Sequence, residues 1–314
     1  MRITPIFILS LPRSGSTLLQ RILSTHPAIS TTPETWVLLP QLYSRKKYGI
    51  QADYNHSWCK AANDEFFNVI GESSYLEELR AFYLGLYEKA SEKESLYFVD
   101  KTPRYSLIVN ELFTLFPDAK FIFLWRNPID ILSSISANWY EDKWVFFNHY
   151  VDIWTGLKNL TDAYEKHQAM SISVQFERLV QQPDATMEEL CAYLQIRKED
   201  INYQSIPSTN VEGLMGDKRG IEQNKINTEL PFRSSEKIDN IFRFFWAKAY
   251  LRMISKRRLE VMDYDYNSID NMIILKNIGL FKTAKDILGG GLLRIKRTVM
   301  FRLQRLLSSI KGSS

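Results

Sequence analysis

The sequence predicts an α/β fold in which a central parallel sheet is flanked by helices. Five short runs rich in branched and aromatic residues lack the polar–apolar alternation of half-exposed strands, and helix-length segments separate most of them. Continuous apolar strands of this kind are typical of a parallel sheet that is covered on both faces. The chain has 314 residues, of which 45% are hydrophobic, and this excludes a disordered protein and allows a large core.

The predicted strands are residues 3–9, 28–31, 96–99, 120–125 and 172–176. Helices are predicted at 15–24, 128–137 and 186–194, after the first, fourth and fifth strands. Pro128 suits the first position of a helix, and Asn127 before it suits an N-cap. In the last helix a buried stripe is predicted from the spacing i, i+3, i+4, i+7 of Met187, Leu190, Cys191 and Leu194.

We expect residues 1–278 to form one α/β domain with helical insertions around 40–92 and 137–168 and a C-terminal helical appendage. Residues 279–314 are expected to be a separate basic amphipathic segment, because they hold eight basic residues and one acidic residue. Such a helix could lie on an anionic membrane surface or pack against the domain. Residues 207–235, rich in Gly, Asn, Ser and charge, predict a long surface loop.

Composition limits the classes of function. The net charge is +4, and outside the basic segment the chain is close to neutral, so we expect no nucleic-acid partner. Cys59 and Cys191 are far apart, which argues against a disulfide scaffold or a structural zinc site. No apolar stretch reaches the roughly 18 to 20 residues of a membrane span, and Met1 leads almost directly into a strand without a signal peptide. We therefore expect a cytoplasmic protein, attached to a membrane only if the basic segment binds one.

The first predicted strand runs into the segment SLPRSGST, residues 10–17, in which a helix begins. This is a P-loop-like layout, although the lysine of the GxxxxGK[ST] motif is replaced by Ser16. Backbone N–H groups and the helix dipole favour an anion at such a helix start. The alternative is a turn with a solvated arginine. We expect a phosphate to bind here, to Arg13, Ser14, Gly15, Ser16, Thr17 and Leu18, and we call residues 10–17 the phosphate loop.

An ordered set of motifs resembles those of sulfotransferases, above all the branch with tyrosylprotein and many bacterial enzymes. The motifs span roughly residues 5–220 and comprise LPRSGSTLL (11–19), HP (26–27), PET (33–35), DKTPR (100–104), FLWRNP (123–128) with Ser134, and FERLV (176–180). The resemblance implies transfer of a sulfuryl group from 3'-phosphoadenosine 5'-phosphosulfate (PAPS) to a hydroxyl or amine acceptor such as a glycan, lipid or small metabolite. It also implies that no metal is required.

Arg126 stands at the carboxyl end of the fourth predicted strand, and Ser134 lies about two helical turns later. Both could face one anion, and the resemblance implies that they hold the 3'-phosphate of the donor, for which a forked guanidinium is suited. The alternative is a local pairing of Arg126 with Asp130. Lys218 and Arg219, in the predicted long loop, are further candidates for the same phosphate, although a solvated loop charge explains them equally well.

Glu34 follows the second predicted strand and therefore emerges at the same edge of the sheet as the phosphate loop. The resemblance implies that it is the general base that deprotonates the acceptor, since a neutral hydroxyl is a poor nucleophile. An acid at a helix start, stabilised by the helix dipole, is the alternative role. His26 is the rival base, but its position in a His-Pro turn favours a structural role.

Lys101 follows the third predicted strand, again at a carboxyl end. By resemblance it stabilises the charge that develops on the leaving phosphate, together with Arg13. Asp100 beside it could instead belong to a magnesium site, as in P-loop kinases, but we favour an ion-pair or loop-orienting role. The predicted function is thus a PAPS-dependent sulfotransferase; the alternatives are an atypical P-loop kinase and a non-catalytic membrane-surface binding protein.

Overall fold

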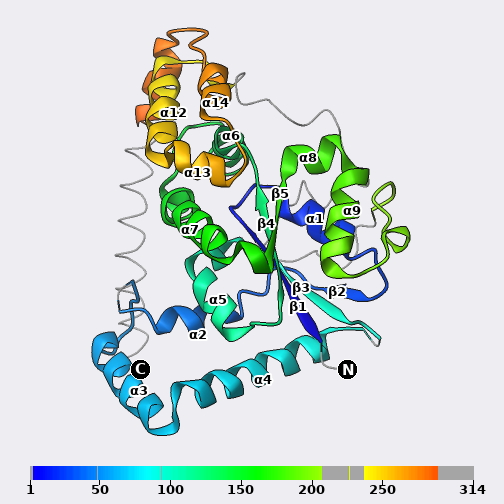
Figure 1. Ribbon diagram of the computed structural model, residues 1–314. Coiled ribbons are helices and arrows are strands. Elements are labelled where there is room, and N and C mark those ends of the chain that lie inside the picture. The colour runs from blue at the N-terminus through cyan, green and yellow to red at the C-terminus, as the bar shows by residue number, and fades with distance from the viewer. Residues whose placement is uncertain (1–2, 48, 93, 207–225, 227–236, 289–314) are drawn as a thin grey trace, which may run out of the picture. The chain divides into compact units, whose positions relative to one another are not determined.

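The computed structural model describes residues 3–47, 49–92, 94–206, 226 and 237–288 (Figure 1). The chain divides into two compact units, one of residues 1–126 and 152–231 and the other of residues 127–151 and 232–314. The boundary predicted after residue 278 stays a prediction. The long loop predicted at 207–235 lies, apart from residue 226, outside the described residues.

The first unit contains a sheet of five strands, all paired in parallel. In space the strands follow the order β2-β3-β1-β4-β5. This confirms the predicted α/β fold, and every predicted strand is present, with bounds shifted by no more than a residue at either end. The strands are β1 (Thr4–Ser10), β2 (Ile29–Thr31), β3 (Tyr97–Asp100), β4 (Lys120–Trp125) and β5 (Ser171–Gln175).

The two faces of the sheet bury different kinds of side chain, because successive residues of a strand point to opposite faces. One face is aliphatic, with Ile6 and Ile8 of β1 packed among residues of α1 (Ser16–Leu23), α8 (Phe176–Gln181) and α9 (Pro183–Leu194). The stripe predicted on α9 is buried there. Figure 1 shows these helices on one side of the sheet.

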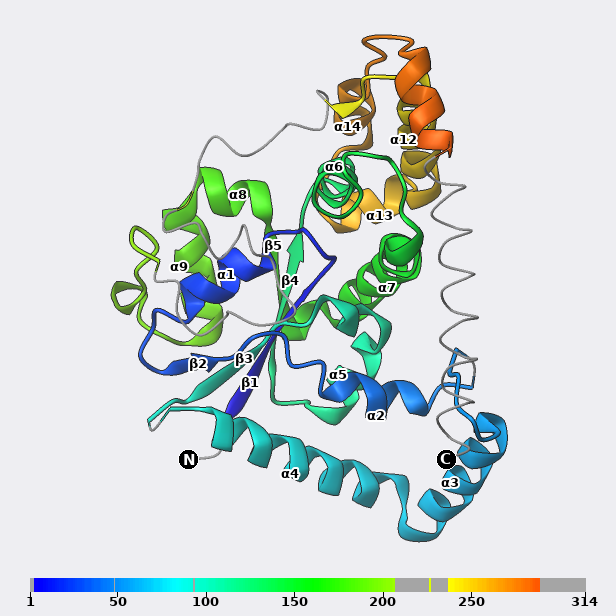
Figure 2. The same cartoon turned by 180° about the vertical axis from the view of Figure 1, so that it is seen from behind.

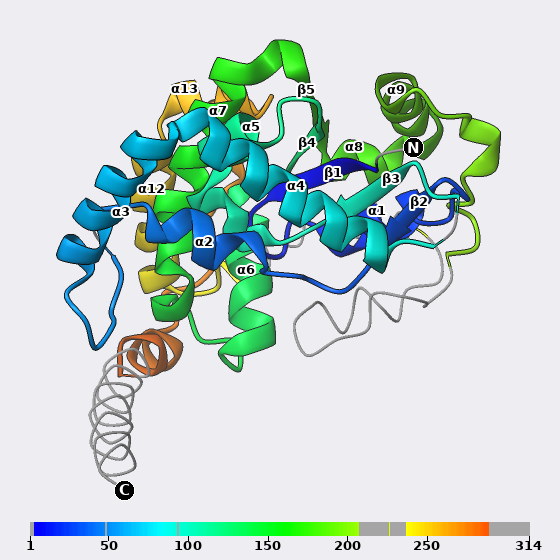
Figure 3. The ribbon, with the colours of Figure 1, turned by 90° about the horizontal axis from the view of Figure 1, so that it is seen from below.

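The other face of the sheet is aromatic. Phe121 of β4 stacks on Phe113 of α5 (Val109–Leu115), with ring centroids 3.8 Å apart. Phe98 of β3 stacks on Tyr87 of α4 (Glu72–Ala90) at 4.6 Å. Seen from below, α4 crosses in front of β1 and β3 (Figure 3). Both faces are thus closed by helices, as the apolar strands require.

Helical insertions occupy both predicted regions. The first contains α2 (Leu38–Ser44), α3 (His56–Ile70) and α4. Asn55 caps α3, since its side chain accepts a hydrogen bond from the backbone N–H of Trp58. The second contains α7 (Leu157–His167), which covers the aromatic face and follows a π-helical turn at Asp152–Gly156.

The second unit is helical where it is described. It contains α6 (Pro128–Trp139), α12 (Ile241–Ile254), α13 (Lys256–Val261) and α14 (Tyr266–Met272), which Figure 2 shows grouped together. The predicted N-cap of α6 is confirmed, because the Asn127 side chain accepts from the Ile129 N–H at 2.9 Å. Residues 280–288 are helical and are held by buried Asp286, which pairs with Arg243 at 2.8 Å. The remaining part of the basic segment, 289–314, lies outside the described residues.

None of the described helices combines the length and the hydropathy needed to span a bilayer. The 19-residue α4 has the length, but charged side chains such as Glu77, Glu78 and Arg80 interrupt it.

Candidate functional site

The carboxyl ends of the parallel strands meet at one edge of the sheet, and the predicted site residues of the first unit emerge there. Glu34 follows β2, Lys101 follows β3, the phosphate loop follows β1, and Arg126 follows β4. The strand order β2-β3-β1-β4 therefore places Glu34, Lys101, the predicted phosphate loop and Arg126 side by side in that sequence. Ligands of doubly wound folds bind at such an edge, where the direction of winding reverses.

The phosphate loop turns sharply between β1 and α1. Arg13 and Gly15 both have left-handed backbones, with φ of 69° and 87°. A Cβ on Gly15 would lie 2.2 Å from Cδ2 of Phe176, so glycine is required here both by backbone conformation and by packing. The same Phe176 ring lies 4.6 Å from the Arg126 guanidinium, and Arg126 donates a hydrogen bond to the Arg13 carbonyl at 3.0 Å. Arg126 and the loop are thus braced against each other.

The groups that an anion could meet in this loop are amides and hydroxyls. The Ser14 N–H donates to the Leu11 carbonyl at 3.3 Å, and the first bond of α1 runs from the Leu19 N–H to the Gly15 carbonyl. The N–H groups of Ser16, Thr17 and Leu18 come before that bond and have no intrahelical acceptor. Within the described part of the chain, the buried hydroxyls of Ser10 and Ser14 also have no hydrogen-bond partner. A phosphate would supply acceptors for such groups.

Glu34 and Lys101 form an ion pair, with Oε1 and Nζ 2.7 Å apart. The two side chains are only 11% and 3% exposed. The second carboxylate oxygen of Glu34 accepts a hydrogen bond from the Trp36 indole N–H at 3.1 Å. Removing two charges from water is costly unless their remaining hydrogen-bonding capacity is satisfied, so this pair is held by specific contacts rather than by chance proximity.

Asp100, next to Lys101, is buried and accepts hydrogen bonds from hydroxyl groups of surrounding residues. The described residues give it no ion pair, and this supports the loop-orienting role over the ion-pair role. No group of three or more His, Cys, Asp or Glu side chains in the described part of the chain is placed to hold a metal ion.

His26 is engaged in the turn between α1 and β2. Its Nδ1 accepts from the Ala28 N–H at 3.1 Å, and its Nε2 lies 3.8 Å from a carboxylate oxygen of Asp200. Burial lowers the pKa of the imidazole, and Asp200 opposes this shift. These contacts support the structural role over that of the rival base.

A series of contacts leads from Glu34 through three residues to which the sequence assigned no role. Trp36 donates to the carboxylate and has a left-handed backbone, with φ of 54°. The Arg104 guanidinium lies 5.8 Å from the Trp36 ring and binds the buried Asp152 through two nitrogens, at 2.8 and 3.0 Å. Burial raises the pKa of Asp152 to about 6, and Arg104 opposes that rise. Arg104 lies within the DKTPR motif (100–104), whereas Trp36 lies just after the PET motif (33–35) and no local signal marked Asp152.

The remaining predicted donor-binding residues lie outside the described part of the first unit. Ser134 lies on α6, in the second unit, where Asn138 hydrogen-bonds its carbonyl at 2.7 Å. Its pairing with Arg126 on one phosphate stays a prediction. Lys218 and Arg219 lie outside the described residues.

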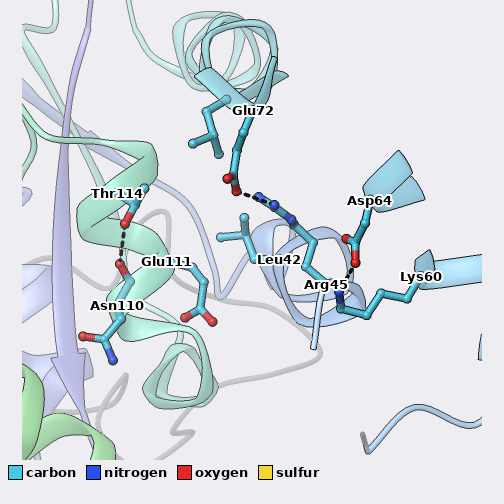
Figure 4. A pocket seen from close by; sticks show the side chains of 9 residues that line it. Leu42, Arg45, Lys60, Asp64, Glu72, Asn110, Glu111 and Thr114 are labelled. Atoms are coloured by element: carbon cyan, nitrogen blue, oxygen red, sulfur yellow. Dashed lines mark hydrogen bonds and ion pairs between the residues drawn. The ribbon is translucent and has the colours of Figure 1, made fainter. Parts of the chain in front are cut away.

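A cavity of about 340 Å³ opens among α2, α3, α4 and α5 (Figure 4). It contains none of the predicted site residues. Its cations are neutralised, because Arg45 pairs with Glu72 at 2.6 Å and Lys60 pairs with Asp64. It therefore offers no unbalanced charge for a phosphate.

Comparisons with known proteins agree with the geometry. The model of the sulfotransferase family matches residues 5–200. The nodulation protein NoeE of Sinorhizobium fredii is 35% identical over 137 residues, which are 42% of this chain and 31% of that protein. Protein-tyrosine sulfotransferase 1 of Danio rerio is 25% identical over 236 residues, which are 70% of this chain and 59% of that protein. This chain thus aligns with less than two thirds of either relative.

A solved structure, the sulfotransferase domain of the Synechococcus PCC 7002 olefin synthase, aligns with a TM-score of 0.49 at 23% identity. The alignment covers 74% of this chain and 88% of that domain.

Replacement of Gly15 by alanine should destabilise the first unit. The new Cβ meets the Phe176 ring, and the left-handed backbone disfavours any side chain, so we expect a loss of about 2–4 kcal/mol in the free energy of unfolding. The matched control is Gly85→Ala, in the middle of α4, where a Cβ meets no atom within 4 Å. It should raise stability by roughly 0.5–1 kcal/mol. Denaturant unfolding of both variants provides the measurement, and equal effects would contradict the role given to Gly15.

Asp152 should make stability depend on pH. Because its pKa is raised on folding, the folded protein binds the proton more tightly than the unfolded chain, and the stabilising contribution falls as pH rises from about 4 through about 6. The stability of wild type relative to Asp152→Asn should therefore drop by roughly 2 kcal/mol between pH 4 and pH 7. Asp162→Asn, which changes a half-exposed carboxylate paired with Lys158, is the control. A pH-independent difference for Asp152→Asn would rule this out.

Proposed function

Since this chain belongs to the sulfotransferase family, we propose that it transfers a sulfuryl group from PAPS to a hydroxyl or amine acceptor. The observation that carries the proposal is the buried Glu34–Lys101 ion pair, one strand away from a phosphate loop. A carboxylate that can take a proton and a cation that can stabilise a leaving phosphate are the two groups that this reaction requires.

Glu34 accepts the proton of the acceptor hydroxyl as the new oxygen–sulfur bond forms. The bond between sulfur and the oxygen of the 5'-phosphate breaks, and the electron pair stays on that phosphate, so adenosine 3',5'-bisphosphate is the second product. Arg13 and the N–H groups of Ser16, Thr17 and Leu18 hold the phosphate and stabilise its growing charge. The chemistry is charge stabilisation and proton transfer, without a covalent enzyme intermediate.

Lys101 connects the two halves of this reaction. Its ammonium has three N–H donors, and among the described residues Glu34 takes one of them. The other two N–H groups of the ammonium can donate hydrogen bonds to the oxygen that joins the sulfur to the 5'-phosphate. The strand order β2-β3-β1 supports a role for the lysine between the base and the leaving group, because β3 lies between the other two strands.

We further propose that Arg126 holds the 3'-phosphate, with Ser134 and the loop residues Lys218 and Arg219 as its partners. The hydrogen bond from Arg126 to the phosphate loop supports the role of Arg126, because the arginine and the loop would bind the same nucleotide. That phosphate distinguishes the donor from ATP.

The acceptor is proposed only as a class. The name of one relative, protein-tyrosine sulfotransferase 1, specifies a phenolic hydroxyl, and a hydroxyl of a glycan, lipid or small metabolite fits the same base. A cytoplasmic location, with the basic segment 279–314 on an anionic membrane surface, remains our proposal from the sequence.

The nucleotide that stabilises the protein should reveal the donor. Adenosine 3',5'-bisphosphate should raise the melting temperature, whereas ADP, and ATP with magnesium, should not. Arg126→Ala should weaken bisphosphate binding at least about tenfold, because a charge-assisted hydrogen bond contributes about 1.5–3 kcal/mol. Arg178→Ala, which removes an arginine paired with Glu189 at the surface, is the control. Equal stabilisation by ATP with magnesium would favour the P-loop kinase instead.

Replacement of Glu34 by glutamine tests the base. The amide cannot take a proton, so single-turnover sulfuryl transfer at saturating PAPS should fall by about 10²- to 10⁴-fold, while bisphosphate affinity and folding persist. His26→Ala should cost stability but little of the rate. A near-normal rate for Glu34→Gln beside a collapsed rate for His26→Ala would move the base role to His26.

A further inference from the structure

Asp100 is the last residue of β3 and has an exposed fraction of only 1%. Its carboxylate is surrounded by four hydroxyl groups that come from three separate segments of the first unit. Oδ2 accepts from Thr35 at 2.8 Å, Tyr87 at 2.7 Å and Tyr105 at 3.0 Å, and Oδ1 accepts from Thr102 at 3.2 Å. We call these four residues and Asp100 the hydroxyl cage.

The carboxylate sets the direction of the four hydrogen bonds that it accepts, and the Thr35 and Tyr105 hydroxyls of the cage also lie 3.0 Å from each other. An ionised carboxylate only accepts, and each hydroxyl has a single proton, which in this arrangement points at Asp100. Burial raises the pKa of Asp100, whereas the hydroxyl donors favour the charged form and oppose that rise. With their protons committed, the hydroxyl oxygens are left as acceptors toward the rest of the loop.

Those oxygens accept from the backbone of the segment that follows Glu34. The Trp36 N–H donates to Thr102 at 3.4 Å, the Val37 N–H to Thr35 at 3.4 Å, and the Leu38 N–H to Tyr105 at 3.2 Å. This segment has no strand partner, and it contains the left-handed Trp36. Its conformation therefore depends on side-chain hydroxyls whose orientation is set by Asp100.

The same carboxylate reaches both members of the ion pair through their neighbours in sequence. Thr35 is adjacent to Glu34, and Thr102 is adjacent to Lys101, so each member is followed by a residue that donates to Asp100. We propose that Asp100 is a positioning residue of the reaction, which through the Thr35 and Thr102 hydroxyls holds Glu34 and Lys101 at their 2.7 Å separation. The inference rests on the proposed function, because it assigns Glu34 and Lys101 their roles.

Thr35→Val is the sharpest variant, because it removes the hydroxyl of the residue next to the base in sequence, keeps the shape of the side chain and leaves Asp100 with three donors. The assay follows the turnover of radiolabelled PAPS in a mixture of phenol, sugar and amine acceptors, with transfer to water included. We expect kcat for this total turnover to fall about 10- to 100-fold. A displacement of about 1 Å of a catalytic group is enough for such a loss. The affinity for adenosine 3',5'-bisphosphate should stay unchanged, and Thr35→Ser should restore kcat.

The matched control is Thr186→Val on α9, where a buried threonine hydroxyl bonds the Gln182 carbonyl at 2.9 Å. It should leave kcat at the wild-type value. If Thr35→Val also keeps the wild-type kcat, or lowers kcat without rescue by serine, the positioning role is wrong.

A crystal structure of Thr35→Val separates this inference from the proposed function. We expect the Glu34 Oε1 and Lys101 Nζ atoms to lie more than 4 Å apart, whereas a retained 2.7 Å pair overturns the inference. Absence of PAPS turnover in the wild type would refute the sulfotransferase reaction, and the interatomic distance would still decide whether the hydroxyl cage holds the pair.

Discussion

The ion pair between Glu34 and Lys101 is the contact on which the proposed chemistry of this edge depends. Two charges this deeply buried are expensive to keep together, and each would prefer water if its loop could move. The indole N–H of Trp36 satisfies the second oxygen of Glu34, and the Arg104 guanidinium covers the Trp36 ring. Glu34, the proposed base, is therefore restrained by Lys101 and Trp36, which is the condition under which a carboxylate can act in a fixed direction.

Two strained backbones lie where the ligand would bind. Arg13 and Trp36, neither of them glycine, have left-handed backbones, and both lie near the carboxyl ends of the strands. Such conformations persist only when the surroundings determine them. Here the hydrogen bond from Arg126 to the Arg13 carbonyl and the bond from the Trp36 N–H to Thr102 of the hydroxyl cage restrain the two backbones. The parallel sheet supplies the frame: because its strands are buried on both faces, their ends are fixed points from which short loops can extend with little freedom.

The sequence predicted the parts of this architecture that are local. Apolar runs gave the strands, Asn127 and Pro128 gave the start of α6, and strand ends marked Arg13, Glu34, Lys101 and Arg126. It did not predict the hydroxyl cage, because Thr35, Tyr87 and Tyr105 converge on Asp100 only after the sheet has formed, and no spacing links them. Nor did it predict Asp152, whose partner Arg104 is 48 residues away. Long-range polar contacts of this kind leave no periodic pattern.

The central claim is that one lysine serves both the base and the leaving phosphate. A crystal structure of the wild-type protein with adenosine 3',5'-bisphosphate tests it most directly. The account predicts the 5'-phosphate on the N–H groups of Ser16, Thr17 and Leu18, with the Lys101 ammonium within hydrogen-bonding distance of a phosphate oxygen. A bisphosphate bound elsewhere, or a 5'-phosphate in the loop with Lys101 still directed only at Glu34, would contradict it.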